Sequence, residues 1–204
     1  MAAKFQRAQA SIIKSIRQVS LFREWLRLRG RNALPLIEDF SPDSRAGDAD
    51  DLAFTDVITN EAGYRFQCRR AGNRMQKAFA RPLKDTFLDE CLDAGIARAA
   101  RPIWQGCIEQ RLPIYSIVPS ADRDGVPVTL EHLYLPFSTD GKTPTKMMAS
   151  MHAFSTESRF QINGLMQQNT DSVPLHWAVV LDPAATIAPA AMPVSDEVIE
   201  VMAI

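Results

Sequence analysis

Three histidines and three cysteines are the side chains best suited to hold a metal or to act as base or nucleophile. The histidines stand 20 and 24 residues apart, at His132, His152 and His176. Structural zinc sites need close ligand pairs, and none occurs here. The odd set of widely spaced cysteines, Cys68, Cys91 and Cys107, is typical of reduced thiols rather than of a disulfide scaffold. We therefore predict no metal site and no disulfide framework.

The sequence also lacks the motifs of common enzymes. Gly-x-Ser-x-Gly, His-Glu-x-x-His and Gly-x-Gly-x-x-Gly are absent. Gly141–Thr143 matches the end of a phosphate-binding loop, but Pro136 replaces the first glycine of that motif. The acidic segment Asp48–Asp51 lacks the glycine and the distal glutamate of a calcium loop, and we expect it to be a solvated loop. Without a positioned nucleophile and base, we predict that the chain is not an enzyme.

Composition places the chain among globular proteins. It has 204 residues, 46% of them hydrophobic and 23% charged, with a formal net charge of -1. No apolar run approaches the roughly 20 residues that span a bilayer, and no secretory signal is recognisable. We expect a cytoplasmic protein of one domain without a membrane span.

Charge is distributed unevenly along the chain. Residues 1–34 hold eight Lys and Arg against one Glu, whereas residues 156–204 hold six acidic residues against one Arg. This polarity indicates an anionic partner, attraction between the chain's own ends or between subunits, or a solvated helix face, which we favour. A peripheral protein that binds an anionic surface, either a membrane or a nucleic acid, stays an alternative. Of the two, nucleic acid is the less expected partner, because no helix-turn-helix or base-stacking platform is recognisable.

The first segment shows an apolar stripe at three- and four-residue steps, which predicts an amphipathic helix. Its members, which we take as candidate dimer contacts, are Phe5, Ile12, Ile16, Val19, Phe22 and Leu26. Ser20 and Gly30 could begin and end a second piece, so one helix and two helices both stay open. The stripe has no obvious use inside a compact domain, and we therefore expect a homodimer through this helix.

The middle of the chain alternates between strand and helix patterns. Strands are predicted at Ala53–Ile58, Tyr64–Arg69, Ile114–Val118, Val126–Phe137 and Thr145–Phe154. A short helix is predicted after Gly72, and a longer one at Ala94–Gln110. This order predicts an α+β fold in which helices cover one face of an antiparallel sheet.

Several stretches resemble the PAS domain family, specifically the bacterial (alphaproteobacterial-type) single-domain group. The resemblance covers about Phe22 to Phe154. It is carried by Phe22, Trp25, Leu28 to Arg31 and Leu34-Pro35, by Tyr64–Arg69 and Gly72, by Arg111 and Pro113 to Tyr115, and by Glu131, Leu133, Leu135 and Pro136. Lys84-Asp85 departs from the family, which usually has Thr-Gly there.

The resemblance implies a PAS-like five-stranded antiparallel sheet with helices on one face, preceded by the N-terminal amphipathic helix. It also implies a sensory or regulatory role, dimerisation and an unknown signalling partner. We accordingly expect an N-terminal helical segment (1–34), a sensory domain (35–155) and an acidic tail rich in Pro and Ala (156–204). The default for this tail is a flexible tether; the alternatives are a docking segment or a lid held by Trp177, and a short final helix at Val198–Met202.

A pocket beneath the helices would take an apolar or aromatic small molecule. Its candidate lining residues are Phe66, Cys68, Phe79, Trp104, Cys107, Tyr115, Tyr134 and Met151. The alternative is that these side chains simply fill the core. No cofactor is predicted: residues 73–82 lack the reactive Cys of flavin-binding relatives, and Ala94–Gln110 offers no His for haem. A haem or flavin sensor stays an alternative, with His132 or His152 as ligand if its strand face points inward.

Overall fold

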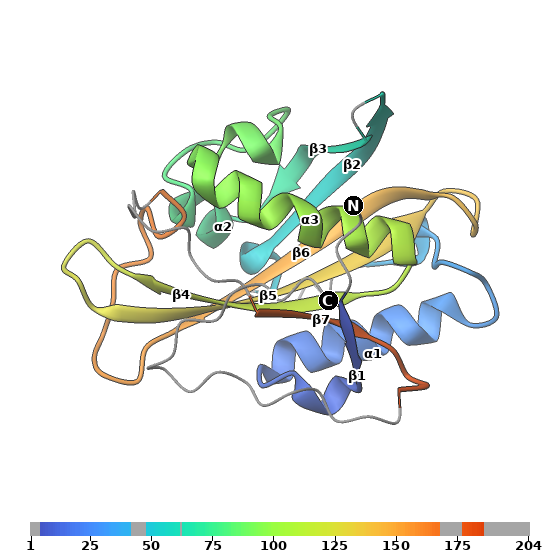
Figure 1. Cartoon of the computed structure of the whole chain (residues 1–204), viewed down its shortest axis with the longest axis horizontal. Coiled ribbons are helices and arrows are strands. Elements are labelled where there is room, and N and C mark those ends of the chain that lie inside the picture. Colours follow the sequence, from blue (N-terminus) through green and yellow to red (C-terminus); the bar gives the residue numbers. More distant parts are fainter. Residues whose placement is uncertain (1–4, 42–47, 62, 168–176, 186–204) are drawn as a thin grey trace.

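The computed structural model describes residues 5–41, 48–61, 63–167 and 177–185 (Figure 1). Within them one sheet has the strand order β1-β7-β4-β5-β6-β2-β3. The strands are β1 (Gln6–Ala8), β2 (Leu52–Asn60), β3 (Gly63–Ala71), β4 (Ile114–Ala121), β5 (Pro127–Ser138), β6 (Pro144–Phe154) and β7 (Trp177–Leu181). The α-helices are α1 (Ile16–Arg29), α2 (Asn73–Ala78) and α3 (Ala94–Gln110), and short 3-10 turns are η1 (Ala10–Ile12), η2 (Ile37–Asp39), η3 (Asp48–Asp51) and η4 (Leu88–Glu90).

The α+β class and the five predicted strands are confirmed. Strands β2 to β6 pair antiparallel, and α3 has the predicted bounds. The count of five is wrong, because β7 pairs with β4 and β1 pairs with β7 in parallel. A three-residue strand such as Gln6–Ala8 carries too few residues to show an alternating pattern, so the sequence offered no signal for it.

Helices cover both faces of the sheet, and the expectation of one covered face is wrong. Figure 1 shows α2 and α3 on one side and α1 on the other. Successive side chains of β5 alternate between the two sides: Leu130 and Tyr134 pack beneath α3, and Leu133 packs beneath α1. Both faces of the central strands are therefore buried, as in sheets covered by helices on both sides.

The N-terminal segment is not the free amphipathic helix that the apolar stripe predicted, and of the two open alternatives it forms one α-helix, Ile16–Arg29, which ends at Gly30. Phe5 lies before β1 and packs against α3 at Gly106, and Ile12 belongs to η1. Phe22 of α1 is buried in the apolar cluster between this helix and the sheet. Val19 and Leu26 are partly buried and pack against the same cluster. Of the candidate dimer contacts, Ile16 alone is largely exposed, at 86%. The stripe is used within its own subunit, because the second face of the sheet is itself apolar.

Two contacts hold α1 in place near its C-terminal end. The indole Nε1 of Trp25 donates a hydrogen bond of 2.7 Å to the Pro136 carbonyl oxygen, and its side chain is 0% exposed. The rings of Phe22 and Trp25 stack with centroids 6.5 Å apart. This half of α1 is therefore part of the domain core.

The described part of the C-terminal region belongs to the sheet. Val179, Val180 and Leu181 of β7 are buried between β1 and β4. A flexible tether thus does not describe Trp177–Leu181. His176 and the helix predicted at Val198–Met202 lie outside the described residues. No helix in the described ranges is both long and apolar enough to cross a bilayer.

The opposite charges of the two ends meet at this edge of the sheet. Arg7 of β1 donates a hydrogen bond of 2.6 Å to Asp182, 175 residues away. The backbone N–H of Ala184 and the Arg7 guanidinium together hold the pKa of Asp182 below its usual value. Attraction between the chain's own ends, one of the interpretations of the charge pattern, is therefore present in the fold.

Candidate functional site

The candidate pocket residues divide between the two faces of the sheet. Seven lie in one buried cluster beneath α3: Phe66, Cys68, Phe79, Trp104, Cys107, Tyr134 and Met151. Tyr115 lies on the opposite face, beneath α1. Its neighbour Ile114 faces α3, and adjacent strand residues point to opposite sides. Tyr115 therefore cannot line a pocket with the other seven.

The seven residues beneath α3 pack against one another as core. The rings of Phe66 and Trp104 meet edge to face at 5.7 Å, and the Cys107 thiol donates to the Tyr134 carbonyl oxygen at 3.6 Å. Burial raises the pKa of Tyr134 to about 12, against smaller opposing effects of Trp104 and Ser116. His132 faces the same side, with its ring stacked on Tyr134 at 5.8 Å. This packing favours the core-filling alternative.

Core packing beneath α3 leads to a testable result for the thiols. Burial raises the pKa of Cys68 to about 11 and raises the pKa of Cys107 as well. A raised pKa lowers the thiolate fraction at a given pH, and the thiolate is the reactive form. At pH 8 we expect the folded protein to react with Ellman's reagent at least about 100-fold more slowly than in denaturant. Rapid labelling of Cys68 and Cys107, located by mass spectrometry, would contradict this packing.

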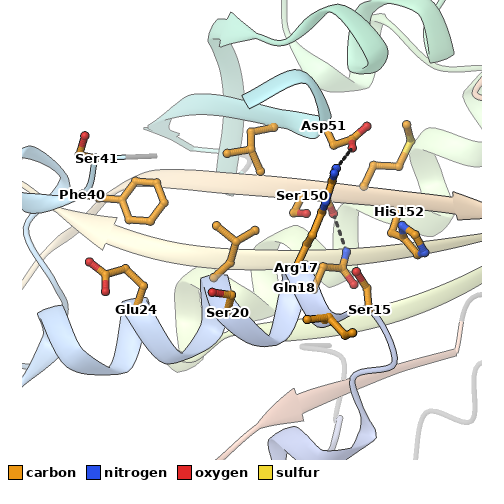
Figure 2. A pocket seen from close by; sticks show the side chains of 14 residues that line it. Ser15, Arg17, Gln18, Ser20, Glu24, Phe40, Ser41, Asp51, Ser150 and His152 are labelled. Carbon is orange, nitrogen blue, oxygen red and sulfur yellow. Dashed lines mark hydrogen bonds and ion pairs between the residues drawn. The ribbon is translucent and has the colours of Figure 1, made fainter. Parts of the chain in front are cut away.

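A cleft of about 640 Å³ opens on the other face, between α1 and the sheet (Figure 2). Its walls are α1 from Ser15 to Glu24, the loop residues Phe40 and Ser41, the junction of η3 and β2 at Asp51 and Leu52, and Ser150–His152 of β6. Of the candidate pocket residues, Met151 contributes to this wall. The cleft thus lies opposite the side on which the resemblance places the pocket.

Gln18 ties the first turn of α1 to the floor of the cleft. Its side-chain Nε2 donates to two main-chain oxygens, of Glu131 on β5 at 3.1 Å and of Ser150 on β6 at 3.3 Å. Gln18 is 1% exposed although it is polar, because the helical period that buries Phe22 also buries the residue four positions before it. The position of α1 over the cleft therefore depends on this amide.

Asp51 forms the charged end of the cleft. Arg17 reaches its carboxylate at 3.5 Å, and Arg74 approaches it from α2 at 3.0 Å. Burial raises the pKa of Asp51, and the two arginines oppose that shift. The expectation that Asp48–Asp51 is a solvated loop is wrong for Asp51, because η3 leads directly into β2 and buries its last residue.

Three buried polar residues, Gln18, Tyr115 and Glu131, lie together between α1 and the sheet, and we call them the acceptor cluster. Glu131 is 0% exposed, and neither of its carboxyl oxygens has a hydrogen-bond partner among the described residues. Gln18 Oε1 also has no hydrogen-bond partner among the described residues, and the Tyr115 hydroxyl lies near enough to the Glu131 carboxyl to interact with it. Burial, and next the nearby Glu131, raise the pKa of Tyr115.

Sequence reasoning missed this cluster, although one signal was present. Glu131 shares the alternation of β5 with Leu133 and Leu135, which are both buried beneath α1. A charged residue in phase with buried apolar residues indicates a carboxyl inside the protein. In the sequence, Glu131 stood out only as a member of a family motif.

Comparison with known families identifies the fold that carries both sites. A family model described as PAS domain matches residues 13–152. The chain belongs to the PAS domain family. No curated protein and no solved structure matches it. PAS domains are sensory or regulatory modules, and the matched range includes α1, the five antiparallel strands up to His152, and the walls of the cleft.

The acidic, histidine and cysteine side chains of this PAS domain are spread over both faces. In the described part of the chain, no three or more of them are placed to hold a metal ion. His132 lies beneath α3, whereas His152 lines the cleft on the other face. The cleft instead combines carboxylates, amide and hydroxyl groups with apolar side chains, a composition suited to binding a small molecule.

Proposed function

We propose that this PAS domain is a cytoplasmic sensory or regulatory protein of the bacterial single-domain group, gated by a small molecule in the cleft. In this proposal it acts by dimerising and by contacting a signalling partner, and it neither catalyses a reaction nor uses haem, flavin or metal. One observation carries the proposal: the cleft is shared between α1 and the sheet, so an occupant contacts both. Three free, buried cysteines agree with a reducing compartment.

The two halves of α1 are held differently, which suggests how a ligand could act. Trp25 anchors the second half through its ring and its bond to Pro136. The first half is held at the cleft by Gln18 and by the ion pair of the exposed Arg17 with the buried Asp51. In this proposal the first half of α1 can take two positions relative to the sheet. A ligand that binds more tightly to one of them shifts the population toward that position.

The exposed Ile16 begins this first half and offers an apolar contact for a second copy. Its side chain is 86% exposed, and it also borders the cleft. In this proposal Ile16 is the apolar contact between the two copies. Occupation of the cleft and exposure of the contact surface would therefore be linked through the same helical turn.

Native mass spectrometry of protein purified without denaturant tests the proposal. We expect a homodimer that retains a small molecule, and a changed dimer fraction after that molecule is removed by unfolding and refolding. Ile16→Glu should yield monomers, because a charge replaces the apolar contact. Arg23→Glu, on the exposed side of the same helix, is the matched control and should leave the dimer intact. A monomer without added mass in both the purified and the refolded protein would contradict the proposal.

A further inference from the structure

We infer that the cleft binds a small organic cation, an ammonium group on an apolar body, and that the acceptor cluster receives the ammonium group. This inference rests on the proposed function, in which the cleft is a ligand site. It names the chemical class of that ligand and the side chains that recognise it.

The acceptor cluster needs hydrogen-bond donors. The atoms without partners among the described residues are both carboxyl oxygens of Glu131 and the side-chain oxygen of Gln18. Roughly 90% or more of buried polar atoms in proteins have a partner. The Tyr115 hydroxyl interacts with Glu131 and has one O–H to donate, so at least two of the three acceptor oxygens of the cluster still lack a donor. These three oxygens can only accept when the carboxyl is ionised, and an ammonium group brings three N–H donors and a compensating charge.

The cluster lies directly behind the wall of the cleft. Gln18 lines the cleft beside Ser150 (Figure 2), and its Nε2 also donates to the main-chain oxygen of Glu131. On the sheet, Glu131 stands opposite His152, which also lines the cleft. Side chains directly opposite in an antiparallel pair have Cβ atoms about 5 Å apart on the same face. Glu131 therefore shares a face of the sheet with His152, and in this inference an occupant displaces Gln18 or His152 to reach the carboxyl group.

Charge in and around the cleft favours a cation over an anion. Arg17 already faces Asp51, and Glu24 is paired with Arg27 at 2.6 Å. Glu131 faces no lysine or arginine of the described residues within salt-bridge distance. A carboxylate or phosphate at this position would find no countercharge in Glu131, whereas an ammonium group supplies the positive charge that a buried carboxylate needs.

Size and lining fit an apolar body attached to the ammonium group. The volume of about 640 Å³ lies within the range of about 300–1,000 Å³ that small-molecule sites occupy. Leu21, Phe40 and Leu52 supply the apolar lining. The ring of Phe40 adds a surface that attracts cations.

Three matched probes that share a phenethyl body test the inference with the full chain. These are phenethylamine, phenethyl alcohol and hydrocinnamate, which carry a positive, a neutral and a negative group. By isothermal titration calorimetry we expect the amine to bind at least tenfold more tightly than either of the others. Glu131→Gln keeps the shape and should weaken binding of the amine at least tenfold.

Stability measurements separate recognition from a merely structural role of Glu131. The free Glu131→Gln variant should melt at the same temperature as the wild type or higher, because a neutral amide replaces a buried carboxyl without a partner. Glu109→Gln, at an exposed position of α3, is the matched control and should change neither binding nor melting. Gln18→Met, which removes the second acceptor, should also weaken the amine, by a smaller factor.

Other results of these measurements contradict either the cation inference alone or the proposed function as well. Hydrocinnamate or the alcohol binding as tightly as the amine overturns the inference, as does a Glu131→Gln variant that binds the amine like the wild type. If the amine fails while native spectra show a retained neutral or anionic molecule, the cation inference fails and the proposed function stands. If no probe binds and no molecule is retained, both fail.

Discussion

Trp25→Ala is expected to lower the free energy of unfolding by about 3–5 kcal/mol. The substitution removes a fully buried ring from the interface of α1 with the sheet, together with the indole N–H that binds the Pro136 carbonyl oxygen. It also removes the stacking partner of Phe22 and the ring that lies 5.5 Å from the Arg29 guanidinium. Urea denaturation, followed by far-UV circular dichroism because the variant loses a tryptophan, measures the loss.

Two further variants show which part of this effect comes from packing and which from the hydrogen bond. Trp25→Phe keeps an aromatic ring but leaves the Pro136 oxygen unpaired, and should cost about 1–3 kcal/mol. Arg23→Ala, exposed on the same helix, should change stability by no more than about 0.5 kcal/mol. If Trp25→Ala behaves like Arg23→Ala, then α1 does not pack on the sheet and the cleft that it forms does not exist.

Gly72→Ala is expected to destabilise the fold by about 2–3 kcal/mol. A Cβ at this position would clash with the Ala49 carbonyl oxygen and with the Asp50 Cα. Both are backbone atoms of η3, so the clash cannot be relieved by rotating a side chain. Because η3 also places Asp51 in the cleft, the variant should lose affinity for any cleft ligand along with stability.

Gly95→Ala is the matched control for this substitution. There the nearest atom is the side-chain Oδ1 of Asp93, at 3.1 Å, which can move by a few tenths of an ångström. Gly95 lies in the first turn of α3, where its N–H donates to the N-cap Asp93, and alanine gains at most about 1 kcal/mol over glycine in a helix. We therefore expect Gly95→Ala to change stability by no more than about 1 kcal/mol. Equal effects of the two substitutions in urea denaturation would show that η3 does not pass over Gly72 as the structure has it.

Features that depend on neighbours in the chain were predictable from the sequence. Alternation over two residues, glycine-containing turns and a 3.6-residue period placed five strands and α3, and the PAS motifs indicated the correct family. These signals are local, because they reflect the side chains that one strand or one helix turns toward a common face. They determine which residues share a face.

Assignment of each face to a partner was not predictable from the sequence. Tyr115 and Glu131 share a face with apolar residues, but both sides of the central strands are apolar, so the pattern is the same whichever helix covers them. Tertiary structure alone placed the two residues beneath α1 and opened the cleft on that side.

The edge of the sheet shows the same division. The sequence by itself determined the family, the five central strands and the opposite charges of the two ends. Only the tertiary structure decided that β1 joins β7, that Arg7 meets Asp182, and that the apolar stripe of α1, apart from Ile16, packs within its own subunit. The physical reason is distance along the chain: backbone hydrogen bonds between segments 175 residues apart form only after the rest of the sheet has brought them together.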